Sequence, residues 1–332
     1  MHLEIEIPDT IITPRHDRLL QSTMDLKHIR TLIAIADTGS ATRAAQLLHL
    51  VQPAVSRHIK LLEDACGAPL FERERHGMVL TDAGRILAEH GRRALRELDA
   101  ARDEIAPGAQ ALSGRLTIGL LASTSRLLAA SLVARIRARY PAVTLGINVG
   151  YAGNVARWLE TGEVELALLY DTRAAQDLQV DALLDERLYV VAPPGQLDAN
   201  TPFPLARLAQ RPVILPNAPH GLRGIIEHAL AVAGIAVEVV AETNALDLQK
   251  SLVAQGFGLT ILPGSAILED LRSGALSAAP VAAPELSRRI VLARTATRRP
   301  SALGAAAAPE LVGLMKDLVA SGAWPGASWV GS

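Results

Sequence analysis

The sequence predicts an α+β chain of several domains: a winged helix-turn-helix, then a long linker helix, then an α/β domain of two subdomains. Three helical patterns and a hairpin pattern lie within residues 24–81, a heptad pattern runs through 82–110, and strands alternate with helices over 111–322. Residues 1–23 have no clear periodicity, so we expect an N-terminal extension there, and we expect a C-terminal tail at 323–332.

Length and composition are those of a folded chain. Of its 332 residues, 49% are hydrophobic and 20% are charged, and the formal net charge is -1. This balance excludes a disordered protein, and it gives no overall signal for nucleic acid. Because Cys66 is the one cysteine, we expect no intramolecular disulfide and no cysteine-based metal cluster. A small buried apolar group is the role that we expect for Cys66.

No apolar run reaches the length of a membrane span, and the N-terminus lacks the layout of a signal peptide. We therefore expect a cytoplasmic, nucleoid-associated protein with no membrane partner.

The first two helical patterns are short and have recognisable ends. Asp25 is a suitable N-cap for the first helix, and Gly39 a suitable stop. Ser40 or Thr42 is suitable as the cap of a second helix that reaches Leu48. A short turn follows and leads into the third pattern.

The third helix begins near Pro53, where a missing N–H costs nothing because first-turn donors have no partner within the helix, and it ends at Gly67. Val55, Ile59 and Leu62 form its inner stripe. Its remaining polar positions point elsewhere: Gln52, Ser56, Arg57 and Lys60. A hairpin pattern, ERERHGMVLT, follows the third helix.

The outer face of the third helix has the chemistry that DNA reading requires. Gln and Arg hydrogen-bond adenine and guanine bidentately, and Ser contacts a base or a phosphate. No acidic residue lies between Asp37 and Glu63, so this region is locally basic. Two helices joined by a tight turn, the second polar outside, are what a major groove accepts.

The segment GSATRAAQLLHLVQPAVSRHIKLLEDACGAPLFERERHGMVLTDAG resembles the N-terminal signature of LysR-type transcriptional regulators. The resemblance implies DNA contacts from the second helix, the recognition helix and the wing. Val51 departs from the pattern, because the family often has Ser there, which caps the recognition helix. Pattern and resemblance together predict these DNA-binding residues: Thr42, Arg43, Gln52, Pro53, Ser56, Arg57, Lys60, Arg73 and Arg75.

Apolar residues recur through 82–110 in alternating steps of four and three, which is typical of a heptad seam. The seam includes Gly91. The predicted dimerisation residues are Leu87, Ala94, Leu98, Ala101 and Ile105. A helix packed on its own domain stays open as an alternative, whereas the resemblance favours paired linker helices in a homodimer or homotetramer. A two-fold dimer implies a roughly palindromic operator.

The C-terminal half alternates between strands and helices in two similar sets. RLTIGLL, VTLGINV and VELALLY are strand-like in the first set, and RPVILP, VEVVAE and GLTILP in the second. We expect subdomain I at 115–189 and 289–322 and subdomain II at 190–288. The resemblance implies a periplasmic-binding-protein-like arrangement, and LLYD, ILPNAPHGLR and GLTILP are similar to the family branch with the nitrogen assimilation control regulators.

Ligands of open α/β sheets bind beyond the carboxyl ends of the strands, where helix N-termini offer N–H donors and a positive dipole. Residues at four such junctions are the predicted effector-binding residues: Ser123, Thr124, Ser125, Tyr151, Tyr170, Asn217, Pro219 and His220. Any of the Ser and Asn residues can instead serve only as a helix cap. Helix N-termini and the resemblance together favour an organic acid or amino-acid-like effector.

The sequence thus predicts a sequence-specific DNA-binding regulator modulated by a small molecule. Its expected partners are double-stranded DNA, the effector, further copies of the chain and RNA polymerase, with no cofactor and no metal site. A solute-binding transport component and an effector-independent regulator remain alternatives. An enzyme with a Schiff base on Lys250 is disfavoured, because the sequence has no nucleophile elbow, phosphate-binding loop or metal-ligand cluster.

Overall fold

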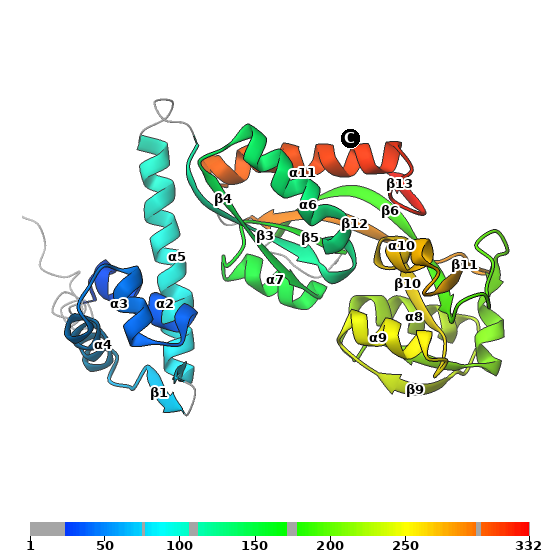
Figure 1. The fold of residues 1–332 in the computed structure, drawn as a ribbon, viewed down its shortest axis with the longest axis horizontal. Coiled ribbons are helices and arrows are strands. Elements are labelled where there is room, and N and C mark those ends of the chain that lie inside the picture. The colour runs from blue at the N-terminus through cyan, green and yellow to red at the C-terminus, as the bar shows by residue number, and fades with distance from the viewer. Residues whose placement is uncertain (1–23, 75–76, 106–111, 171–177, 297–299, 332) are drawn as a thin grey trace, which may run out of the picture. The chain divides into compact units, whose positions relative to one another are not determined.

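The computed structural model describes residues 24–331 except 75–76, 106–111, 171–177 and 297–299, and for Arg73, Arg96, 99–100 and 102–105 it describes the backbone alone (Figure 1). The chain divides into two units, residues 1–102 and 103–332. No helix among the described residues has the length and apolarity needed to cross a membrane.

The first unit has the predicted winged helix-turn-helix. Its elements are α2 (Leu26–Thr38), α3 (Ala41–Leu47), α4 (Gln52–Cys66), β1 (Phe71–Glu74), β2 (Gly77–Leu80) and the start of α5 (Asp82–Ile105). Strands β1 and β2 pair antiparallel and form the wing. Apolar side chains from all three short helices and from the wing fill one core, centred on Leu32, Ile35, Val55, Leu62 and Leu70.

Local hydrogen bonds set where these helices begin and end. The carboxylate of Asp25 accepts from the Lys27 N–H, and the hydroxyl of Ser40 caps α3 by accepting from the Arg43 N–H. Gly39 ends α2 in the left-handed conformation, with φ 66°. Its carbonyl accepts from the N–H of Met78 at 2.9 Å, which joins the end of α2 to the wing.

Two side-chain contacts hold α4 against its neighbours. Thr31 Oγ1 on α2 lies 2.8 Å from His58 Nδ1 on α4, and Glu63 Oε1 accepts from the Leu70 N–H at 2.9 Å. Val51, the N-cap of α4, makes no capping hydrogen bond with its side chain. The helix nevertheless begins at Gln52, because Pro53 in its first turn already has the helical φ.

In the second unit, subdomain I is a sheet between two layers of helices. Strands β3 (Gly114–Leu121), β4 (Val143–Gly150) and β5 (Leu166–Tyr170) run parallel, and β12 (Ser287–Thr295) joins antiparallel to β5. Helices α6 (Ala122–Arg139) and α11 (Ala302–Ala320) cover one face, and α7 (Ala152–Glu160) covers the other (Figure 1).

Subdomain II repeats the alternation of strand and helix. Its strands are β7 (Phe203–Pro204), β8 (Pro212–Leu215), β9 (Glu238–Glu242), β10 (Thr260–Pro263) and β11 (Ser277–Ala282). Its helices are α8 (Gly221–Val232), α9 (Leu246–Ala254), α10 (Gly264–Ser273) and the 3-10 helix η1 (Leu205–Gln210). Strands β8 and β9 pair in parallel.

One long strand, β6 (Leu178–Ala192), connects the subdomains. Its first part pairs with β12, and its last part pairs with β10 and β11. The expected subdomain boundaries, 189/190 and 288/289, therefore fall inside β6 and β12. Both strands continue across the junction, so no turn residues mark it in the sequence.

Of the residues expected to form a C-terminal tail, 323–332, those that the structure describes, 323–331, pack on the second unit. Strand β13 (Ala327–Trp329) pairs with β6, and the side chain of Trp324 is 1% exposed. Helix α11 begins at Ala302, where the hydroxyl of Ser301 caps it by accepting from the Gly304 N–H, and it continues through Pro309.

Candidate DNA-binding face and ligand pocket

Helix α4 has one buried and one exposed face. Val55, Ile59 and Leu62 are buried in the core of the first unit. The predicted DNA-binding residues of α3 and α4 are all exposed: Thr42, Arg43, Gln52, Pro53, Ser56, Arg57 and Lys60. The structure therefore brings these seven residues to the surface of two adjacent helices joined by a turn of four residues.

The cations on this face differ in their partners. Lys60 Nζ pairs with Asp64 Oδ1 at 2.8 Å, and the hydrogen bond from Lys60 to Asp64 raises the pKa of the lysine. Within the described part of the chain, neither Arg43 nor Arg57 has an ion-pair partner. Their guanidinium groups are thus free to meet an external anion.

The wing is described in part. Arg73 lies on β1 opposite Met78 of β2, and its side chain is outside the described atoms. Arg75 lies outside the described residues altogether.

The predicted seam on α5 divides between two environments. Leu87 packs against the core of the first unit, and Gly91 is buried where a Cβ atom would meet Ile29. Ala94, Leu98 and Ala101 are exposed, whereas the side chain of Ile105 is outside the described atoms. The first turns of α5 thus pack on their own domain, which is the alternative to a dimer seam. The later positions form an exposed apolar stripe.

Two features of the first unit differ from the sequence analysis. Ile86, which the heptad count omits, is 60% exposed on α5. Cys66, expected to be buried, is exposed at the end of α4, because the helix ends there and only part of the side chain is covered.

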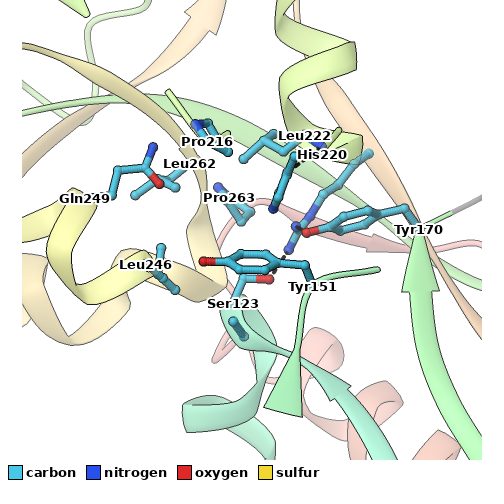
Figure 2. Close-up of a pocket in the computed structure, with 12 residues that line it drawn as sticks. Ser123, Tyr151, Tyr170, Pro216, His220, Leu222, Leu246, Gln249, Leu262 and Pro263 are labelled. Atoms are coloured by element: carbon cyan, nitrogen blue, oxygen red, sulfur yellow. Dashed lines mark hydrogen bonds between the residues drawn. The ribbon is translucent and has the colours of Figure 1, made fainter. Parts of the chain in front are cut away.

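A pocket that is partly open to solvent lies between the two subdomains, and its empty space, with the open solvent at its mouth included, is about 340 Å³ (Figure 2). It is lined mostly by residues at the ends of strands and near the beginnings of helices in both subdomains, together with Arg288 of β12. The lining consists of Ala122, Ser123, Tyr151, Tyr170, Pro216, His220, Leu222, Leu246, Gln249, Leu262, Pro263 and Arg288.

Four of the predicted effector-binding residues meet in this pocket: Ser123, Tyr151, Tyr170 and His220. The other four do not line it. Thr124 and Ser125 turn their hydroxyls to the backbone of their own helix, where they donate to the carbonyls of Leu121 and Ala122. Asn217 and Pro219 are exposed in the loop before α8.

Arg288, which no pattern in the sequence singles out, is 3% exposed. Its guanidinium donates to Glu186 Oε2 at 2.9 and 2.7 Å, to the hydroxyl of Tyr170 at 2.6 Å and to Ser123 Oγ at 2.8 Å. It thereby joins strand β6 to two residues of the pocket. The pairing of two charged residues 102 positions apart leaves no local pattern in the sequence.

Glu186 is the counter-ion of Arg288, and its hydrogen-bonding capacity is fully used. Its Oε1 accepts from the Ser265 N–H and from the indole Nε1 of Trp324, both at 2.9 Å, while Oε2 accepts from Arg288. Both oxygens of this fully buried carboxylate are therefore occupied. The ion pair in the wall of the pocket is neutral as a whole.

His220 is a neutral imidazole with a defined tautomer. Its Nδ1 accepts from the Leu222 N–H at 3.1 Å, so the proton of the neutral ring is on Nε2. Burial, and secondarily the charge of Arg288, lowers the pKa of His220 to about 4. Nε2 is buried with no hydrogen-bond partner among the described residues, and the ring lies edge-on to Tyr151 at 4.7 Å.

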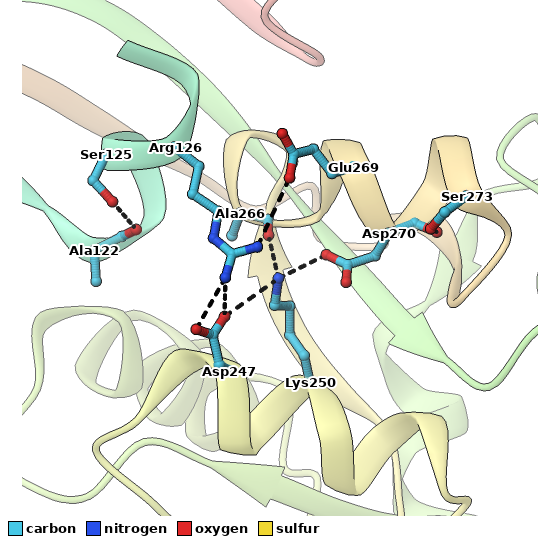
Figure 3. A network of polar contacts seen from close by, with 9 residues as sticks. All are labelled: Ala122, Ser125, Arg126, Asp247, Lys250, Ala266, Glu269, Asp270 and Ser273. Atoms are coloured by element: carbon cyan, nitrogen blue, oxygen red, sulfur yellow. Dashed lines mark hydrogen bonds and ion pairs between the residues drawn. The ribbon is translucent and has the colours of Figure 1, made fainter. Parts of the chain in front are cut away.

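Charged side chains also link the subdomains beside the pocket (Figure 3). Arg126 of α6 contacts both carboxylate oxygens of Asp247 on α9, at 3.2 and 3.1 Å, and lies 3.8 Å from Glu269 on α10. Lys250 is buried, with Nζ 2.7 Å from Asp270 Oδ2. Gln249, one turn away from Leu246, was also missed by the sequence analysis and lines the pocket.

Both halves of the chain match family models. Residues 26–85 match the bacterial regulatory helix-turn-helix of the LysR family, and residues 109–316 match the LysR substrate-binding domain. The HTH-type transcriptional regulator BbuR of Bordetella bronchiseptica is 30% identical, with 91% of this chain and 94% of that protein covered. The nitrogen assimilation regulatory protein Nac of Escherichia coli is 29% identical, with 73% and 79% covered.

Solved structures have the same fold. A full-length OxyR variant of Pseudomonas aeruginosa is 23% identical with a TM-score of 0.68, over 87% of this chain and 94% of that one. Full-length CbnR in complex with its target DNA is 19% identical with a TM-score of 0.64, over 89% and 99%. The chain therefore belongs to the LysR family of transcriptional regulators, with the family's helix-turn-helix and substrate-binding domain both present.

Proposed function

We propose that the chain binds a specific, roughly palindromic operator as a homodimer or homotetramer, and that a small molecule in the pocket between the subdomains modulates that binding or the activation of RNA polymerase. The observation that carries this proposal is the exposed face of α4, with Gln52, Ser56 and Arg57 opposite a fully buried apolar stripe. Such a face fits the major groove, where Arg and Gln read base edges.

Modulation by a ligand is supported by the pocket itself. Its polar lining comes from both subdomains, so an occupant contacts α6 on one side and α8 and α9 on the other. A ligand shifts a conformational equilibrium when it binds one arrangement of the subdomains more tightly than another. The favoured ligand class is an organic acid or an amino-acid-like metabolite, because helix N-termini surround the pocket.

We further propose that the pocket is not catalytic. Ser123 and His220 both line it, but the proton on His220 Nε2 leaves that nitrogen unable to accept the hydroxyl proton of Ser123. Lys250 does not line the pocket, and its buried Nζ contacts Asp270 Oδ2 and the Ala266 carbonyl, so it is not placed to attack an occupant of the pocket.

The test of DNA reading begins with selection of binding sites from a random DNA library by the full chain. Affinity for the selected site is then measured at fixed salt for the wild type and for Arg57→Ala. We expect Arg57→Ala to weaken binding by about 1–3 kcal/mol, the worth of one bidentate base contact, without a change in unfolding temperature.

Arg139→Ala is the matched control, because it removes the same charge from an exposed position at the end of α6 in the second unit. It should leave affinity for the selected site unchanged. Equal affinities for wild type and Arg57→Ala, or failure to select any site, would contradict the proposed recognition helix.

A further inference from the structure

We propose that the pocket takes a compact carboxylate that carries a hydroxyl group and no ammonium group, that is, a small hydroxy acid in preference to the amino acid of the same shape. This inference rests on the proposed function, because it specifies the ligand class of the same pocket. The hydrogen-bonding groups that line the pocket select the hydroxy acid from the wider class of organic acids and amino-acid-like molecules.

The side of the pocket next to Arg288 offers hydrogen-bond donors. Arg288 donates to Ser123 Oγ and to the hydroxyl of Tyr170, so each of these oxygens has accepted a hydrogen bond and keeps its own hydrogen for a further partner. No acceptor for either hydrogen is found among the described residues. In Figure 2 the hydroxyl of Tyr170 points toward the interior of the pocket.

His220 adds a third donor. Because Nδ1 is occupied by the Leu222 N–H, the buried Nε2 carries a hydrogen without a partner among the residues described. A buried polar group without a partner costs free energy, which an acceptor on a ligand would recover. Three donors on one side match a carboxylate, whose two oxygens together accept about four hydrogen bonds.

An ammonium group has no comparable place among the described lining residues. The carboxylate of Glu186 is saturated by Arg288, Ser265 and Trp324, and Asp247 does not line the pocket. The N-terminal ends of α6, α8 and α9 contribute lining residues, and their dipoles are positive at these ends. A buried cation would therefore meet positive potential and no free carboxylate of this lining.

Gln249, opposite Tyr170 in Figure 2, is the acceptor for a ligand hydroxyl. Its Nε2 donates to Thr260 Oγ1 at 2.6 Å and to the Ile214 carbonyl at 3.4 Å, which leaves Oε1 for the ligand. One acceptor suffices for one hydroxyl hydrogen. It does not suffice for the three N–H groups of an ammonium, and this difference selects the hydroxy acid.

The experiment uses the full chain and two matched pairs of probes, L-lactate with L-alanine and L-malate with L-aspartate. Each pair exchanges a hydroxyl for an ammonium on otherwise the same skeleton. Binding is measured by titration calorimetry and by the rise in unfolding temperature. We expect at least one hydroxy acid to bind, and its amino-acid counterpart to bind at least tenfold more weakly.

Ser123→Ala and His220→Ala should each weaken binding of that hydroxy acid by about tenfold or more. Ser125→Ala is the control, because it makes the same change on the same helix, where the hydroxyl donates to the Ala122 carbonyl and does not line the pocket. It should bind as the wild type does. The unfolding temperature of each ligand-free variant shows whether it is folded.

Equal or tighter binding of the amino acids, no binding of any of the four probes, or binding unaffected by Ser123→Ala and His220→Ala would overturn the inference. Failure of this inference can be distinguished from failure of the proposed function. A chain that binds its operator and responds to a different ligand would refute the ligand class alone, whereas one that binds malate and selects no DNA site would refute the proposed function.

Discussion

Individual side chains decide what the pocket can bind. Some of these pocket residues could be predicted from the sequence, and others could not. Tyr151 follows β4 and Tyr170 is the last residue of β5, and both strands are recognisable from the sequence, so the place of these residues in the pocket could be predicted. Arg288 and Glu186 could not, because charged residues are expected at the surface unless a partner is known. Their partnership joins two different strands and becomes visible only in the folded chain.

His220 makes the stability of the second unit depend on pH. Its pKa is lowered to about 4 in the folded chain from an ordinary value of 6.5, so between these values the unfolded chain binds a proton that the folded chain does not. The free energy of unfolding is therefore expected to fall as the pH decreases from about 6.5 to about 4. Above that range the stabilisation that comes from the lowered pKa of His220 is fully present.

His220→Asn is the comparison variant, because Asn keeps an N-cap acceptor for α8 and does not titrate. Denaturant unfolding of both proteins at several pH values measures the difference. A wild type that loses no more stability than His220→Asn between pH 6.5 and 4 would show that the histidine is not held neutral.

At the scale of elements, periodicity and end signals predicted the helices and strands that have a simple pattern. Pro53 and Gly67 delimit α4, and parallel β3, β4 and β5 alternate with helices as expected. The connection through β6 was not predicted, because Asp185, Glu186 and Arg187 interrupt its apolar pattern. Pro309 lies inside α11 rather than at its first turn, so this proline does not mark the start of the helix in the sequence.

Val51 leaves the start of α4 without a side-chain cap. It is 69% exposed and supplies no capping hydrogen bond, whereas Ser at an N-cap accepts from a first-turn N–H. Val51→Ser is expected to raise the free energy of unfolding of the first unit by about 0.5–2 kcal/mol. Denaturant unfolding followed by circular dichroism measures the change. Unaltered or reduced stability would mean that the first-turn N–H groups already have partners.

The exposed stripe on α5 predicts an oligomer. Leu98 is 42% exposed, although Leu87 on the same helix packs on its own core. Leu98→Glu would place like charges together if two such helices pair, so we expect sedimentation to show a smaller assembly. Leu98→Ala, which loses apolar area without adding charge, should have a weaker effect. Full assembly of Leu98→Glu would place the oligomer contacts elsewhere.

At the scale of the whole molecule, two subdomains are joined by strands and by surface ion pairs. The contacts of Arg126 with Asp247 and Glu269 are exposed, and such pairs contribute about 0–1 kcal/mol each. These surface pairs therefore oppose a change in the arrangement of the subdomains only weakly, whereas the buried pair of Arg288 with Glu186 and the continuous strands β6 and β12 are the stronger links. The sequence could not predict this linkage, since Arg126 and Asp247 are 121 residues apart.

Occupancy of the pocket is expected to change regulation at a specific DNA site. The most direct measurement is a reporter assay on a promoter with the selected site, run with a panel of small carboxylates. We expect at least one to change reporter output for the wild type and for Ser125→Ala, while His220→Ala keeps its basal output and loses the response. Output that no ligand changes in the wild type, or a normal response in His220→Ala, would contradict the claim.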